Sequence, residues 1–156
     1  MPETWRTIVA AALEAREAHV PLDRAVAGLA PELRGRRPQG LPHSAWELLE
    51  HIRIAQADLI AYVEDPTYAA PVWPDGYWPP APEPPTDAAW DDAVEALQRG
   101  RARLQELVIE LPEPAATIPW GGDHTYLRSM LLALDHEAYH LGQLVLVRRA
   151  MGAWPG

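Results

Sequence analysis

Apolar residues recur at every third or fourth position along most of this chain, which is the spacing of helices that bury one face. The first such segment covers residues 4–28, and Pro21 inside it removes a backbone donor and should kink that helix or split it in two. The second begins at Ser44, which forms a capping-box sequence with Glu47, and its apolar positions continue to Val63. Both segments are therefore predicted to be amphipathic helices.

The C-terminal half carries two longer helical patterns. One covers residues 87–110 and the other residues 125–152, whose first turn can be capped by Thr125 or by Asp123 just before it. Gly152 and the two arginines near it suit the C-terminal end of a helix. No segment alternates apolar and polar residues as a half-buried strand would, so an all-α chain is predicted.

Three connections join these helices. Residues 31–42 form a basic stretch marked by proline and glycine, which is predicted to be a solvated loop. Residues 64–86 hold eight prolines, too many for a helix, and residues 111–123 are a second proline-marked loop. The longer connection either covers a site as a lid or packs on the bundle through its aromatic residues. Those residues are Tyr68, Trp73, Tyr77 and Trp78. The prediction is one domain over residues 1–156, a four-helix bundle with long crossover loops.

The last helical segment carries the strongest candidate for a chemical site. His136 and His140 are four residues apart, about 400° of helical rotation, so both imidazoles leave the helix on one face and can bind one ion. Gln143 falls in the same sector, where it could orient a ligand or hydrogen-bond a substrate. Buried imidazoles need polar partners, which favours metal binding over simple packing. The same helix face also carries Ser129, Ala133 and Val147, whose small side chains leave space around the two histidines.

A third histidine lies on the second predicted helix. His51 is at the edge of the apolar sector of that helix and is the best candidate for a further ligand. Asp58 and Glu47 lie near it by helical phase, and either could accept the second N–H of its ring. His19 and His124 are weaker candidates near the mouth of the site, where surface or capping roles are more common.

The composition narrows the classes of function. The 156 residues, of which 48% are hydrophobic, suffice for one domain with a core. The chain contains no cysteine, so a metal site must use histidine and carboxylate ligands. A formal charge of −9 argues against binding to nucleic acid, because that affinity rests on basic residues. Without a recognisable signal peptide or an apolar run of about 18 residues, we expect a cytoplasmic protein outside the membrane.

Three stretches of this sequence resemble the DinB-like family, which includes the YfiT-type thiol transferases. They are Leu41-Pro-His-Ser-Ala-Trp-Glu-Leu-Leu-Glu-His-Ile52, Trp120-Gly-Gly with Thr125, and His136-Glu-Ala-Tyr-His-Leu-Gly-Gln143 followed by residues 148–155. The resemblance implies a four-helix bundle of the DinB/YfiT type that holds one divalent metal ion. The ligands it implies are His51, His136 and His140, the same residues that the helix faces favour.

The resemblance also implies a class of reaction. In the thiol S-transferases of the family, a low-molecular-weight thiol activated by the metal attacks an electrophile. Because this chain has no cysteine, such a thiol would have to be a co-substrate. Hydrolysis of a small molecule is the related alternative. Zinc is the first choice of metal, and histidine ligands also suit Ni, Fe, Mn or Co. A homodimer is a further expectation, since dimers are common among such bundles and loop tryptophans could supply an interface.

Two other interpretations stay open. The segment from His136 to His140 matches H-E-x-x-H, the zinc metallopeptidase helix in which the glutamate is a general base. The 16 residues after His140 contain no further His, Asp or Glu and no strand is predicted, which argues against a peptidase. Glu137 remains a candidate base, although a solvated carboxylate on the helix surface is expected, and Gln143 is the other catalytic candidate. The chain could instead be a metal-stabilised binding or stress-response module without turnover.

Overall fold

A computed structural model of the chain describes residues 4–14, 18–111, 113 and 115–155. In these residues every regular element is helical, apart from an isolated antiparallel bridge between Thr117 and Thr125. The helices are α1 (Trp5–Leu13), α2 (Leu22–Val26), α3 (Pro31–Arg34), α4 (Ala45–Glu64), α5 (Asp87–Glu110) and α6 (Tyr126–Ala150), with a short 3₁₀ helix, η1 (Asp75–Tyr77). The prediction of an all-α fold is confirmed.

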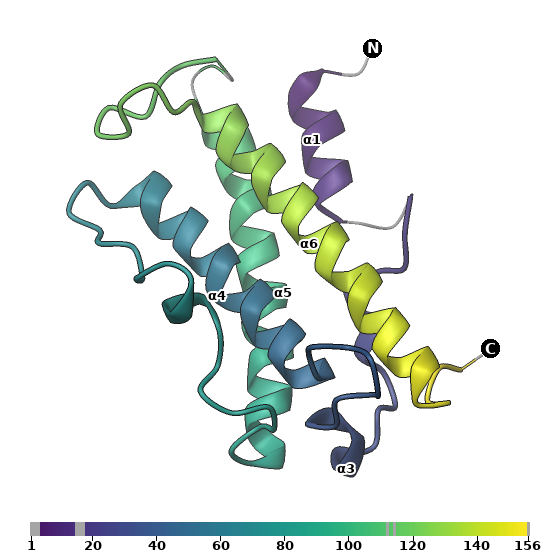
Figure 1. Ribbon diagram of the computed structural model, residues 1–156. Helices are drawn as coiled ribbons and strands as arrows, with labels where there is room; N and C mark the ends of the chain where they lie inside the picture. Colours follow the sequence, from purple (N-terminus) through teal and green to yellow (C-terminus); the bar gives the residue numbers. More distant parts are fainter. Residues whose placement is uncertain (1–3, 15–17, 112, 114, 156) are drawn as a thin grey trace.

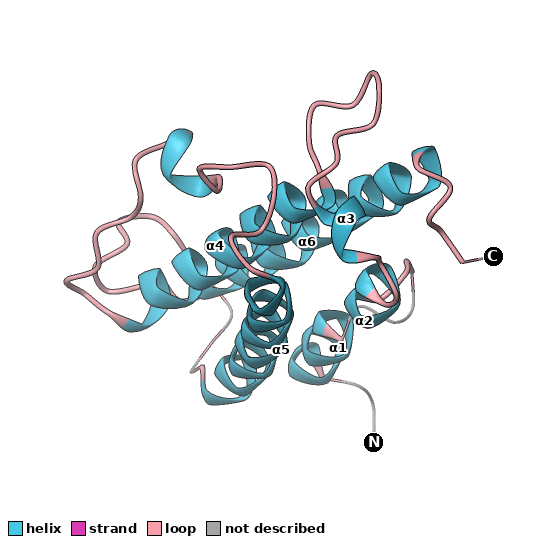
Figure 2. Cartoon of the chain, turned by 90° about the horizontal axis from the view of Figure 1, so that it is seen from below, coloured by secondary structure: helices cyan, strands magenta, loops and turns pink. Residues whose placement is uncertain are grey.

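The three long helices and α1 form the bundle (Figure 1). Helix α4 packs against both α5 and α6, and α1 packs mainly against α5. In the view along α5, α1 lies beside it, and the connection that follows α4 passes along the outer side of α4 (Figure 2). This connection contains η1, which also packs on α4. Helix α4 therefore touches both of the other long helices and the proline-rich connection.

The first predicted helix is split rather than continuous. Helix α1 begins after Thr4, whose side chain caps the first turn, and it ends at Leu13. Pro21 is the N-cap of α2, so the helix restarts directly after the residue that lacks an amide hydrogen. Gly28 beyond α2 has a φ of 66°, a left-handed conformation that glycine adopts without strain. The expectation of a split at Pro21 is confirmed, and residues 15–17 of the predicted helix lie outside the described part of the chain.

Capping residues fix the starts of the two helices that carry the candidate ligands. At α4 the Glu47 amide donates to Ser44 Oγ at 3.1 Å, and the Ser44 amide donates to Glu47 Oε2 at 2.8 Å, which completes the predicted capping box. At α6 it is Thr125, rather than Asp123, whose hydroxyl accepts a hydrogen bond from the Arg128 amide, at 3.2 Å. Both helices therefore begin where the sequence places them.

The basic stretch of residues 31–42 is more ordered than the predicted solvated loop. Pro31 begins α3, a single turn of helix, where proline is tolerated because its nitrogen needs no partner within the helix. Arg37 donates from Nε to Glu47 Oε2 at 2.8 Å and makes a second contact through Nη2. Since Glu47 is buried, this contact ties the stretch to the start of α4, while most residues of the stretch remain at least partly exposed, as expected for a solvated connection.

Buried apolar side chains form two clusters along the bundle. One includes Leu48 of α4 and Leu144 of α6. The other includes Val108 of α5 and Met130 of α6. Residues 136–140 of α6 lie between the parts of that helix that contribute to the two clusters. A polar site at this level therefore interrupts the apolar core near the middle of the bundle.

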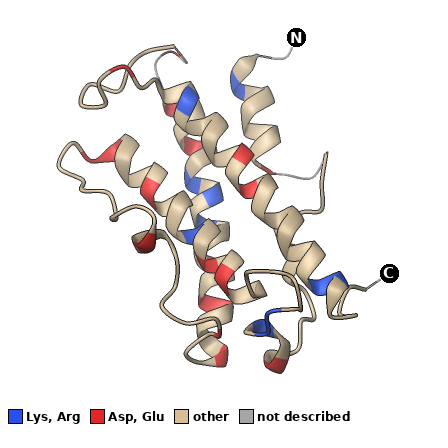
Figure 3. Ribbon diagram, viewed as in Figure 1, with Lys and Arg blue, Asp and Glu red and all other residues tan. Residues whose placement is uncertain are grey.

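Charged residues of both signs are spread over the long helices (Figure 3). Arg103 of α5 forms an ion pair with Glu64 of α4 at 2.6 Å, and it also contacts Glu106 at 2.9 Å. Exposed pairs of this kind each contribute little stability, and this one joins two helices at their surface. Among the described residues, no helix combines the length and the apolar character that crossing a bilayer requires.

Candidate metal centre

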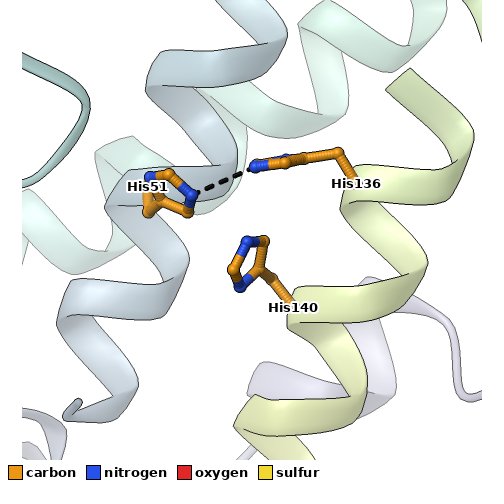
Figure 4. Close-up of side chains that lie close together, drawn as sticks. All are labelled: His51, His136 and His140. Carbon is orange, nitrogen blue, oxygen red and sulfur yellow. Dashed lines mark hydrogen bonds between the residues drawn. The ribbon is translucent and has the colours of Figure 1, made fainter. Parts of the chain in front are cut away.

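Three histidines from two helices face one another near the middle of the bundle (Figure 4). His51 projects from α4, and His136 and His140 project from successive turns of α6. Nε2 of His51 lies 3.0 Å from Nε2 of His136, and one ligand atom from each of the three residues lies within 4.8 Å of the others. Two nitrogens on one tetrahedral zinc ion are roughly 3.3 Å apart, so this spacing fits a shared ion. The three predicted ligands are brought together, and they can hold one metal ion.

The site lies between the two helices that form it. The ring centroid of His51 lies 4.8 Å from that of His136 and 4.5 Å from that of His140. His51 and His140 are buried, whereas His136 is half-buried. Their spacing follows from local structure, because residues four apart share a helix face and α4 packs directly on α6.

In His51 and His140, a hydrogen bond to one ring nitrogen determines which nitrogen remains available to bind a metal ion. His51 Nδ1 lies 2.7 Å from the carbonyl oxygen of Tyr77, and His140 Nδ1 lies 2.7 Å from Oε1 of Gln143. Both oxygens only accept hydrogen bonds, so each neutral ring carries its proton on Nδ1 and presents the lone pair of Nε2 to the centre of the cluster. This is the arrangement in which a neighbouring acceptor orients a metal-binding imidazole. Gln143 thus contacts a candidate ligand, as its helical phase suggested.

The carboxylates predicted to accept the second N–H of His51 have other partners. Glu47 is bound by Arg37 and by the Ser44 amide. Asp58 accepts the hydroxyl of Tyr68 at 3.0 Å. Neither carboxylate therefore takes the role at His51 that helical phase allowed. The proline-rich connection brings a backbone carbonyl to the ring instead, a contact that helical phase on α4 cannot show.

The environment keeps the three imidazoles neutral. Burial, with a smaller effect from the neighbouring His140 and His51, lowers the pKa of His136 to about 4. Burial is also the largest cause that lowers the pKa of His51 and of His140. A histidine binds a metal ion only through an unprotonated nitrogen, so the rings are in the correct protonation state at neutral pH.

A tryptophan from the proline-rich connection stacks on the site. The rings of Trp78 and His51 are parallel, with centroids 3.9 Å apart and an interplanar angle of 1°. His43 also stacks on Trp78, with centroids 4.2 Å apart and an interplanar angle of 15°. Helical phase assigned no role to His43, because this residue precedes α4. Its signals in the sequence were its position next to the capping residue Ser44 and its place in the stretch from Leu41 to Ile52 that resembles the DinB-like family.

A cavity of about 280 Å³ opens beside the histidines. Its lining consists of His51, His136, Ala55, Asp58, Leu59, Trp73, Tyr77 and Leu132. Two of the three candidate ligands therefore border a space that a small molecule can enter. Both roles predicted for residues 64–86 have support, since Trp73 and Tyr77 form part of the cavity wall and Trp78 packs against the apolar core.

Glu137 is not the solvated carboxylate expected from the sequence. It is buried on α6 and forms an ion pair with Arg101 of α5. This contact depends on how α5 is rotated about its axis relative to α6. The apolar pattern of one helix alone does not predict that rotation. The pair ties the helix that carries two candidate ligands to α5.

The two weaker histidine candidates lie outside the cluster. His19 Nδ1 is 2.9 Å from the carbonyl oxygen of Val20. His124 Nδ1 is 3.1 Å from the hydroxyl of Tyr62. In the part of the chain that the structure describes, the group of residues spaced to hold a metal ion is the trio alone.

Comparison with known proteins agrees with this arrangement. The profile of the DinB superfamily matches residues 14–144, a range that includes all three clustered histidines. No curated protein and no solved structure matches the chain significantly. The matched range covers well over half of the chain, and its helices are those that build the site. The chain belongs to the DinB superfamily.

Proposed function

We propose that this protein is a metal-dependent enzyme that acts on a small molecule, with His51, His136 and His140 as the ligands of one divalent ion. The observation that carries the proposal is the convergence of three neutral imidazoles next to a cavity. Three protein ligands leave at least one coordination position for water or substrate, which is the pattern of catalytic zinc sites rather than of closed structural ones. Zinc is our first choice, and Ni, Fe, Mn or Co would suit the same ligands.

Transfer of a thiol is the leading reaction. A bound divalent ion lowers the pKa of a coordinated thiol or water and so supplies a nucleophile near neutral pH. The chain contains no cysteine, so the thiol would come as a low-molecular-weight co-substrate. Its sulfur would form a bond to an electrophilic carbon, the leaving group would depart with the bonding electrons, and the thiol proton would pass to solvent. Hydrolysis of a small molecule is the alternative for the same site.

The chain's own residues would prepare this site. The Tyr77 carbonyl and Gln143 hold two of the rings so that Nε2 is available. Trp78 covers one face of the His51 ring and limits the access of water to it. Such fixed ligands lose little freedom when an ion binds, which favours tight binding.

Two other functions have less support. A non-catalytic, metal-stabilised module would need no substrate space, whereas two of the three histidines border a cavity. A metallopeptidase of the H-E-x-x-H type would use Glu137 as its base, but Arg101 binds that carboxylate. The isolated bridge at Thr117 also supplies no long strand edge for a peptide, within the residues described.

Elemental analysis of the protein, purified without a histidine tag or a chelating column, is the first test. We expect about one transition-metal ion per chain, as three ligands from a single chain imply. The loaded protein would then be given low-molecular-weight thiols with monochlorobimane, an electrophile whose thiol adduct fluoresces. Catalysis that disappears in His136→Ala and survives in His19→Ala supports the proposal. Protein that neither carries nor binds a metal would contradict it and bring the binding-module function forward.

A further inference from the structure

The cavity beside the histidines has two chemically different ends. His51 and His136 contribute two candidate ligands to its lining, and Asp58 contributes a carboxylate. Asp58 follows His51 by seven residues on α4, so the two lie on the same helix face about 10 Å apart along the axis. Ala55 lies between them and leaves the floor of the cavity open. A molecule that fills this space would meet the metal site at one end and a carboxylate at the other.

The sides of the cavity between these ends are apolar and aromatic. Leu59 and Leu132 contribute aliphatic surface. Trp73 and Tyr77 contribute two rings with centroids 5.4 Å apart and an interplanar angle of 62°, so they form two walls that meet at a steep angle. Aromatic faces attract cations through their quadrupole, and paired aromatic walls are a common way to bind alkylammonium groups.

The Asp58 carboxylate has capacity for a further donor. Tyr68 donates its hydroxyl to Oδ1 at 3.0 Å. Burial raises the pKa of Tyr77 to about 12, helped by a hydrogen bond to Asp58, so the Tyr77 hydroxyl also remains protonated beside the carboxylate. An ionised carboxylate has about four lone-pair sites, and two tyrosines leave some of them unused.

We infer that the cavity binds a short bipolar substrate, with a metal-binding donor at one end, an apolar body, and a protonated amine that reaches Asp58 at the other. The metal-binding end rests on the proposed function, whereas the amine end rests on Asp58, Trp73 and Tyr77 alone. At about 280 Å³ the space holds roughly ten heavy atoms, since a water molecule occupies about 30 Å³ of liquid. A carboxylate on the substrate would face Asp58 in a partly dehydrated space and be repelled.

Three para-substituted benzenethiols of nearly equal size test this inference. They carry an aminomethyl, a methyl or a carboxylate group opposite the thiol. Calorimetric titration of the zinc-loaded protein should rank them in that order of affinity. We expect the aminomethyl compound to bind about tenfold tighter than the methyl compound, the gain typical of a charge-assisted hydrogen bond in a protein site.

The variant Asp58→Asn should remove the preference for the amine and weaken the discrimination against the carboxylate. Asparagine keeps an oxygen that can accept the Tyr68 hydroxyl, so the loop contact is preserved. Asp91→Asn is the matched control, because it removes the same charge from an exposed position on α5. Unchanged zinc content and circular dichroism would show that both variants fold.

The metal-binding and amine-binding parts can fail separately. If the thiols bind no better with zinc than without it, the proposed thiol chemistry is wrong. Benzylamine and benzoate, titrated into the metal-free protein, then still test Asp58. Benzylamine should bind more tightly, and Asp58→Asn should abolish the difference. Equal affinity for the two probes, or a preference that survives Asp58→Asn, would overturn the inference.

Discussion

The imidazole of His51 on α4 is bound by a backbone atom of the proline-rich connection, with Nδ1 2.7 Å from the carbonyl oxygen of Tyr77. A candidate metal ligand is thus oriented by a segment 26 residues away in sequence. Because the acceptor is the backbone carbonyl of Tyr77, a substitution that changes only the side chain of this residue leaves the acceptor in place. The side chain of Tyr77 lies in the cavity wall, so one residue both orients the metal site and shapes the adjacent space.

Removal of any clustered histidine should abolish metal binding. We expect His51→Ala, His136→Ala and His140→Ala each to reduce bound metal from about one ion per chain to near zero, because two imidazoles alone form a weak site. Mass spectrometry of desalted protein measures the content directly. His19→Ala is the control and should keep its metal, since His19 lies outside the cluster. Full occupancy in all three ligand variants would show that the trio is polar packing.

Gln143 should affect metal affinity without being a ligand. Gln143→Leu removes the acceptor of the His140 ring, and we expect the affinity for zinc to fall roughly 10- to 100-fold, as when other partners of metal-bound histidines are lost. Competition with a chelating dye measures the change. Gln143→Glu keeps an acceptor oxygen and should retain most of the affinity. Equal affinity in the leucine variant and the wild type would mean that the contact does not orient the ring.

Helical periodicity and the packing of two helices account for the clustering of the three candidate ligands. His136 and His140 share a face because of their four-residue spacing, and the capping box at Ser44 fixes the register of the helix that carries His51. Packing of α4 on α6 then brings the three rings together. The trio therefore depends on local rules that a sequence displays directly, together with one helix contact.

The surroundings of the ligands could not be predicted in the same way. The Tyr77 carbonyl and the Trp78 ring come from a connection without periodicity, whose path depends on tertiary packing. The burial of Glu137 depends on how α5 is rotated relative to α6, which the pattern of either helix leaves undetermined. Apart from Gln143, whose place beside His140 was suggested by helical phase, the residues that orient and cover the site are thus the part that required the structure.

The buried pair of Arg101 and Glu137 should matter more for stability than for the reaction. Glu137→Ala leaves the largely buried Arg101 guanidinium, whose side chain is 14% exposed, without its partner, which typically lowers the free energy of unfolding by about 3 kcal/mol. Urea unfolding of the metal-free protein measures this loss. The double variant Arg101→Met with Glu137→Leu should recover much of it, because an apolar pair of similar volume needs no charge compensation. A double variant as unstable as Glu137→Ala would show that the unpaired charge of Arg101 does not cause the loss of stability.

Acid should weaken the junction between α4 and the basic stretch before it. Burial alone would raise the pKa of Glu47, but hydrogen bonds from Arg37 and from Ser44 outweigh it and lower the pKa below its ordinary value. A carboxylate whose pKa is lowered by folding contributes stability above its unfolded pKa of about 4.3. That contribution is lost as the pH falls from there through the folded pKa.

Glu47→Gln isolates this contribution. At pH 7 the variant should be less stable than the wild type by about 1–2 kcal/mol, the usual value of hydrogen bonds to a charged group. The difference should shrink below pH 4, where the wild-type carboxyl also becomes neutral. Urea unfolding at several pH values measures both curves, and Glu95→Gln, at an exposed pair with Arg99, should show little effect at any pH. A gap between Glu47→Gln and the wild type that stays constant from pH 7 to pH 3 would mean that Glu47 stabilises α4 through its capping geometry rather than through its charge.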